Sequence, residues 1–102
     1  MIKLINTHRI IKATERITGK PACILKGRSR KSSVVLARNL CIKIAKDHLY
    51  LSDEEIARSF KRERGSITHA LKQVEKKLDE RPQYKRTLQA IEEELGINGR
   101  GY

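Results

Sequence analysis

The chain has 102 residues, of which 34% are charged and 4% aromatic, and its net charge is +11. This length suits one compact domain, over residues 1–102, and is too short for an enzyme domain joined to a binding domain. No apolar run approaches the roughly 20 residues needed to cross a bilayer, and no apolar signal segment opens the chain. Cys23 and Cys41 lack CxxC spacing, and Cys41 falls on a predicted apolar helical stripe. We therefore expect a cytoplasmic protein with reduced thiols and a buried Cys41.

Positive charge is concentrated in the first half of the chain. Residues 1–50 hold 12 Lys and Arg against 2 Asp and Glu, whereas residues 51–102 hold 11 against 10. A solvated surface explains the balanced half but not a net charge of about +10 in about 50 residues. Such an excess indicates a polyanionic partner, with nucleic acid as the leading candidate. A membrane surface fits less well, because no helix combines a basic face with large aromatic side chains.

The first helix is predicted from its ends. Asn6 or Thr7 can cap it, and it runs to about Thr18, where Gly19 suits the C-terminal stop. Its inner face is expected to hold Ile10, Ala13 or Thr14, and Ile17. Residues 1–5 are expected to fray, and a loop or short turn should follow the helix as far as Gly27.

A basic segment, residues 26–31, precedes a long second helix and has four cations in six residues. Ser32 or Ser33 can cap this helix. Its apolar positions recur at i, i+3 and i+4, which is typical of a core-facing helix. They are Val34, Ala37, Leu40, Cys41, Ile44, Ala45 and His48.

A short helix, a tight turn and a second helix are predicted between Ser52 and Asp79. Ser52 and Glu55 form a capping box, and Leu51 and Ile56 have the spacing of a hydrophobic staple. The second helix has a buried face made of Ile67, Ala70, Leu71, Val74 and Leu78. Its opposite face carries Arg64, Ser66, His69 and Lys72. This is the layout of a helix-turn-helix, whose second helix lies in the major groove of DNA.

A last helix should begin at Pro82, which is favoured at the first helical position, and end at Gly96. Its apolar face comprises Tyr84, Leu88, Ile91 and Leu95. The acidic run 53–55 belongs at a helix N-terminus, the run 92–94 on an exposed helix face, and residues 97–102 should fray. No alternating strand pattern occurs. The predicted fold is therefore all-α, a compact bundle of about five helices that contains the helix-turn-helix.

Signals for chemistry are missing. The sequence has no glycine-rich phosphate-binding loop, and its three histidines have no metal-ligand spacing. We predict that the protein is not an enzyme and that it uses no cofactor and no metal.

Two segments together resemble the C-terminal DNA-binding domain of the bacterial replication initiator DnaA. The first runs from Lys26 to Arg30 and continues in Ala37-Arg38-Asn39 and Ile44-Ala45-Lys46, like the family's basic loop and the long helix after it. The second, Arg62 to Ala70, resembles the signature R-D-H-T-T-V-x-H-A. The spacing between the two blocks is nearly that of the family, and the similarity spans roughly Ile5 to Leu95.

The resemblance implies an all-helical fold of the Trp-repressor-like group and binding to duplex origin DNA. It implies a minor-groove role for Arg28 or Arg30 and phosphate contacts for Arg38 and Lys46. Packing at the helix boundary is an equal alternative for His69. The expected DNA-binding residues are Lys26, Arg28, Arg30, Lys31, Arg38, Lys46, Lys61, Arg62, Arg64, Gly65, Ser66, His69 and Lys72.

The signature departs from the family at several positions. Glu63, Arg64 and Gly65 stand where the family has Asp, His and the first Thr, and Lys61 stands where a glycine is usual. The family's docking mode is therefore expected without its recognition sequence. The family's ATPase module does not accompany this domain, so we expect a stand-alone DNA-binding protein or an excised domain.

The leading hypothesis is a sequence-specific duplex DNA-binding protein, nucleoid-associated, which acts as a monomer or DNA-induced dimer in replication-origin binding or its regulation. One alternative is a dimeric Trp-repressor-like transcriptional repressor, suggested by the spacing from Leu51 to Thr68. Another is an architectural or RNA-binding protein that uses charge alone, although the basic surface lacks aromatic stacking residues. A third is a helical adaptor that docks on a replication protein.

Overall fold

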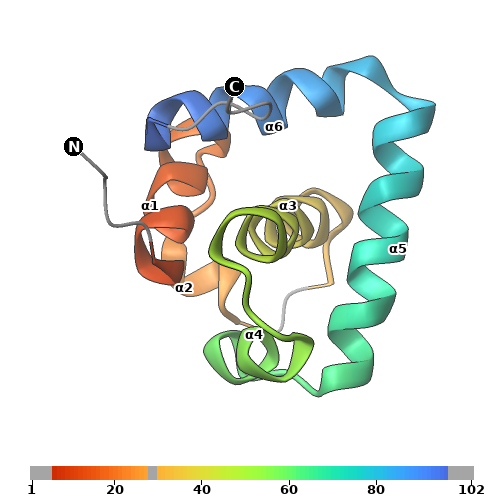
Figure 1. Cartoon of the computed structure of the whole chain (residues 1–102). Coiled ribbons are helices and arrows are strands. Elements are labelled where there is room, and N and C mark those ends of the chain that lie inside the picture. The colour runs from red at the N-terminus through yellow and green to blue at the C-terminus, as the bar shows by residue number, and fades with distance from the viewer. Residues whose placement is uncertain (1–5, 28–29, 97–102) are drawn as a thin grey trace.

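The computed structural model describes residues 6–27 and 30–96, which form six helices and no strand (Figure 1). None of these helices is both long enough and apolar enough to span a membrane. The predicted all-α class is confirmed. Residues 1–5 and 97–102, expected to fray, lie outside the described part of the chain. The helices are α1 (Thr7–Thr18), α2 (Ala22–Leu25), α3 (Ser32–Leu49), α4 (Asp53–Phe60), α5 (Arg64–Glu80) and α6 (Pro82–Leu95).

The sixth helix beyond the predicted five is α2, a single turn in the stretch expected to be a loop or short turn. Four residues are too few to show helical periodicity in a sequence. The Leu25 N–H donates to the Pro21 carbonyl at 3.0 Å, so the proline that interrupts the chain also begins this turn.

Helix α3 lies at the centre of the fold, and α1, α2, α4 and α5 all contact it (Figure 1). The predicted stripe from Val34 to Ala45 is buried, and His48 at its end is half-buried. Arg38, Asn39 and Ile42, which lie outside that stripe, are buried as well. A helix enclosed on several sides buries more than one face, and a one-sided pattern understates this.

Helix ends confirm most of the predicted caps. The Asn6 side chain accepts the Arg9 N–H at 2.9 Å, and Ser52 and Glu55 form the complete capping box. Gly19 ends α1 with a φ of 76°. The prediction that Ser32 or Ser33 caps α3 is wrong. The Lys31 carbonyl already accepts the Val35 N–H at 2.8 Å, so the helix begins one residue earlier and Ser32 is its first residue.

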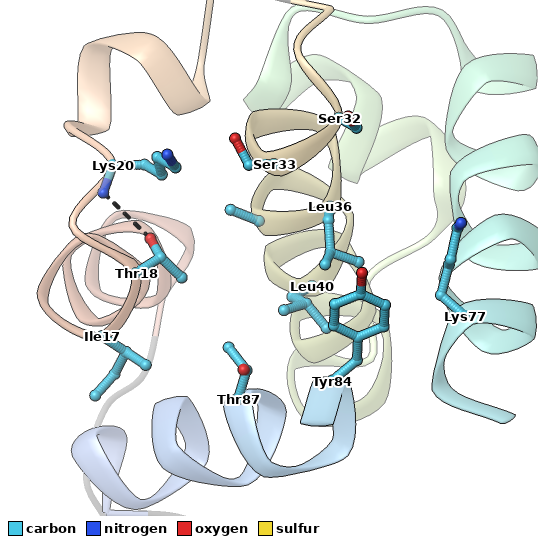
Figure 2. A pocket seen from close by; sticks show the side chains of 11 residues that line it. Ile17, Thr18, Lys20, Ser32, Ser33, Leu36, Leu40, Lys77, Tyr84 and Thr87 are labelled. Atoms are coloured by element: carbon cyan, nitrogen blue, oxygen red, sulfur yellow. Dashed lines mark hydrogen bonds between the residues drawn. The ribbon is translucent and has the colours of Figure 1, made fainter. Parts of the chain in front are cut away.

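The inner face of α1 differs from the prediction at its C-terminal end. Ile10, Ala13 and Thr14 are buried as expected, but Ile17 is 37% exposed, and Ile11 is buried instead. Ile17 borders a groove of about 490 Å³ between the ends of α1, α3, α5 and α6 (Figure 2). Because this groove is open beside Ile17, the Ile17 side chain is only partly covered.

The acidic run 92–94 was expected on an exposed face, and this is wrong for Glu92. Its side chain is buried, and its Oε2 lies 3.0 Å from the Nε2 of His48. Helix α6 packs against α1, and Glu94 pairs with Arg16 of that helix. One member of an acidic run on a packed helix turns inward, and it then requires a polar partner.

Phe60 and Cys41 are both buried in the core. Phe60, at the end of α4, is the largest fully buried side chain, although the low aromatic content had left the core to aliphatic residues. Cys41 is buried as predicted, and burial raises the pKa of its thiol to about 12. Its Sγ donates to the Thr14 Oγ1 at 3.0 Å. The other thiol, Cys23, is exposed.

Replacement of Ile67 by Asp should unfold the protein. Ile67 is completely buried in the core. An unpaired buried carboxylate costs several kcal/mol, against a total stability of roughly 5–15 kcal/mol. Circular dichroism during urea titration measures the effect, with Ile24→Asp, at a position that is 41% exposed, as the control. A cooperative transition of Ile67→Asp near that of the control would contradict the proposed packing.

Candidate nucleic-acid interface

The turn between α4 and α5 is closed by backbone bonds. Lys61 has a left-handed conformation with a φ of 55°, and the Arg62 N–H donates to the Ala57 carbonyl at 2.8 Å. Glycine is the usual residue at this position of a helix C-terminus. For any other residue, the left-handed backbone costs about 1–2 kcal/mol of folding free energy. The Lys61 side chain is exposed. The turn therefore keeps a cation at a position where glycine would be easier to accommodate.

Asp53 joins three helices at the start of α4. Its Oδ1 accepts from Lys46 Nζ of α3 at 2.8 Å, and its Oδ2 accepts from Thr68 Oγ1 of α5 at 3.0 Å. The hydrogen bonds from Lys46 and then Thr68 hold the pKa of Asp53 below its usual value. These bonds help to fix α4 and α5 against α3. They also place the Lys46 ammonium group on a carboxylate, and they show a role for Thr68 that sequence reasoning missed.

The exposed face of α5 matches the predicted layout. Ile67, Ala70, Val74 and Leu78 are buried and Leu71 of the predicted buried face is half-buried, while the residues predicted as contacts are open to solvent. A methyl group added to Gly65 would meet no protein atom within 4 Å. His69 is exposed, and it also lines a hollow between α3 and α5 together with Arg38. The predicted contacts on α5 that are exposed are Arg64, Gly65, Ser66, His69 and Lys72.

The basic segment contributes a second group of cations. Lys26, Arg30 and Lys31 are exposed, whereas Arg28 lies outside the described residues. The segment connects α2 to α3 and is therefore on the N-terminal side of the central helix. The carbonyl of Gly27, at its start, is bonded to Arg38 of α3 and to Arg62 of the turn between α4 and α5.

Arg38 and Arg62 both extend to the backbone that precedes the basic segment. Arg38 Nε donates to the Leu25 carbonyl at 2.8 Å, and its Nη2 donates to the Gly27 carbonyl at 3.1 Å. Arg62 Nη2 donates to the same Gly27 carbonyl. The carbonyls at the end of a one-turn helix lack helical partners, and these guanidinium groups supply them. Arg38 was predicted to contact phosphate at the surface, but the structure buries its side chain, which is only 6% exposed.

Arg62 lies where the start of the basic segment meets the helix-turn-helix. It borders a hollow of about 160 Å³ between α3 and α5, together with Arg38, Ser66 and His69. Burial lowers the pKa of Arg38, and the nearby charge of Arg62 lowers it further. The Nε atom of Arg62 is buried and has no hydrogen-bond partner. No set of three or more His, Cys, Asp or Glu side chains within residues 6–27 and 30–96 is placed to bind a metal ion.

Asp53→Asn should lower the melting temperature at neutral pH. Since the folded-state pKa of Asp53 is lowered, its ionised form stabilises the fold above the usual carboxyl pKa of 3.8, and this contribution is lost as the pH falls through the folded-state value. Melting curves at pH 7 and pH 2 measure the difference, which should narrow at the lower pH. Glu54→Gln, on the same helical turn, is the control. A gap that is the same at both pH values would contradict the role of the carboxylate.

Comparison with known proteins agrees with this arrangement. No curated protein shows significant similarity to the chain. A family model described as the bacterial DnaA protein helix-turn-helix matches residues 7–74. The matched region begins at α1, includes the basic segment, all of α3 and α4, and ends within α5. It therefore contains both groups of exposed cations and the turn that joins α4 to α5. The chain belongs to the family of bacterial DnaA helix-turn-helix domains, which bind double-stranded DNA.

Proposed function

We propose that this protein binds a specific duplex DNA sequence and takes part in replication-origin binding or its regulation, at the nucleoid in the cytoplasm. The N-terminal part of α5 enters the major groove, and the basic segment enters the adjacent minor groove. The observation that carries this proposal is the exposed polar face of α5, which stands opposite the buried Ile67 and Ala70 in a member of the DnaA family.

The exposed face of α5 suits base recognition at its first turn. Arg64 is the first residue of the helix, and an arginine there can donate two hydrogen bonds to guanine O6 and N7. The open space at Gly65 allows the backbone to approach base edges closely. Ser66 and His69, three residues apart, are exposed further along α5. Lys72 is two turns from the helix start and is assigned to phosphate, as a contact that positions the helix.

Cations on both sides of the recognition helix supply the remaining affinity. Lys61 projects from the turn, and Lys26, Arg30 and Lys31 project from the basic segment. An arginine in a narrow A·T-rich minor groove responds to groove width and potential, and Arg30 or Arg28 would take this role. Lys46, whose ammonium group is bonded to Asp53, is assigned to holding the motif in place.

Binding should weaken steeply with salt. About six cations of the interface are candidates for phosphate contacts, so the slope of log affinity against log salt should be on the order of −4 to −6. Fluorescence anisotropy between low and moderate salt measures it. Lys61→Asn removes a charge and tolerates the left-handed conformation, and it should reduce the slope by about 1. Lys85→Asn, on the exposed side of α6, is the control. A flat salt response would contradict the electrostatic part of the proposal.

Arg64→Ala should relax the preference at one base pair of a site selected from random duplexes. A bidentate arginine–guanine pair contributes about 1–3 kcal/mol of discrimination. The measurement is the selected-site profile of each variant, with a melting curve to establish that the fold is intact. Lys72→Ala is the comparison, since loss of a phosphate contact lowers affinity for all sequences alike. A uniform loss in Arg64→Ala would exclude base reading by this residue, and equal affinity for all duplexes would leave only a charge-based binder.

A further inference from the structure

One backbone carbonyl connects three parts of the interface. The Gly27 oxygen accepts hydrogen bonds from Arg38 of α3 and from Arg62 of the turn between α4 and α5. Arg38 also donates to Leu25, two residues earlier. Gly27 is separated from Arg62 by 35 residues in the chain. The start of the basic segment is therefore bonded both to the central helix and to the helix-turn-helix.

The arrangement is not one that stability alone would select. Two guanidinium groups converge on one neutral oxygen, and the Coulomb repulsion between them is unfavourable. The buried Nε atom of Arg62 has no hydrogen-bond partner. A buried donor without a partner costs free energy and calls for an explanation. Alignment of the two DNA-contacting parts supplies one.

Gly27 itself is adapted to this contact. A Cβ atom at this position would lie 3.1 Å from the Cys23 carbonyl oxygen and 3.4 Å from that of Ile24. Both are backbone atoms of α2 and cannot move aside as a flexible side chain would. A larger residue would therefore shift the chain and displace the oxygen that both arginines contact.

We propose that Arg62 is a positioning residue: together with Arg38 it holds Gly27, at the start of the basic segment, beside the turn that precedes the recognition helix. Arg62 then acts on DNA binding through Gly27 and does not contact DNA itself. This inference rests on the proposed function, because it assigns the segment and the helix to adjacent grooves. Holding two binding elements in register before they meet DNA removes part of the ordering cost of binding, and it strengthens both contacts together.

The first test needs no DNA. Hydrogen exchange of the Lys26 and Gly27 amides, which donate to the Ala22 and Ile24 carbonyls, reports the order of this turn. Arg62→Ala should accelerate exchange at both amides on the order of tenfold. Arg58→Ala removes an exposed arginine from α4 and serves as the control. Unchanged exchange in Arg62→Ala would overturn the inference, whether or not the proposed function holds.

The second test separates positioning from a phosphate contact. Affinity for A·T-flanked and G·C-flanked sites is measured for Arg62→Ala, Arg30→Ala and the double variant. If Arg62 acts through the segment, its loss should remove the A·T preference to the extent that Arg30→Ala does. The double variant should then bind within about twofold of Arg30→Ala, because the two effects are not additive.

A phosphate contact gives the opposite pattern. Arg62→Ala would then weaken both kinds of site equally, lower the salt slope by about 1, and add its full effect to that of Arg30→Ala, and this result would overturn the inference. Two further variants address a loss of folding in Arg62→Ala. Arg62→Lys keeps the charge but not the planar donor group, and Gly27→Ala removes no charge at all. Both should reproduce the loss of A·T preference, and wild-type preference in both would equally overturn it.

Discussion

The enclosure of α3 is the constraint from which the rest of the structure follows. Because other helices surround it, a polar side chain that is buried on α3 needs a hydrogen-bond partner in a neighbouring element. Arg38 reaches the end of α2, Lys46 reaches Asp53 of α4, and His48 reaches Glu92 of α6. The Nζ of Lys43 lies 3.7 Å from the Oε2 of Glu75 in α5. The central helix therefore positions its neighbours by polar bonds with defined directions as well as by apolar packing.

This has a direct effect on the DNA-binding surface. Apolar contacts tolerate small rotations of a helix, whereas a hydrogen bond weakens when its angle changes. The carboxylate of Asp53 belongs to α4 and is bonded to both α3 and α5, so it adds directional bonds to the packing that sets the angle between the helices of the motif. The carbonyl of Gly27 has the same role for the basic segment. Two small polar junctions therefore join the elements that carry the proposed DNA contacts.

Features with a local cause could be predicted from the sequence. The cap at Asn6, the capping box at Ser52, the stop at Gly19 and the two faces of α5 all depend on residues within one or two turns of one another. Ile17 was placed inward for the same reason, and this was wrong because its exposure depends on where α1, α3 and α6 diverge. Local spacing identifies a helix and its apolar side, but not the extent to which neighbours cover it.

The remaining features depend on pairs that are far apart in the chain. The burial of Arg38 and Glu92 requires partners in other helices, and a charged residue in a sequence does not indicate whether such a partner exists. Arg62 occupies a signature position of the family and was therefore assigned to DNA, while its contact with Gly27 spans 35 residues. Helix α2 is too short for any periodic signal.

The contacts of α6 with α1 and α3, called the seam here, stabilise the fold at a distance from the residues proposed to recognise DNA. Arg16–Glu94 and His48–Glu92 join the first helix and the central helix to a last helix that lies beyond the matched residues 7–74. This seam lies at the opposite end of the molecule from the turn between α4 and α5 (Figure 1). Substitutions at well-separated sites act almost independently on stability. The exposed face of α5 can therefore diverge during evolution and acquire a new target sequence, while a distant seam preserves the fold that presents it.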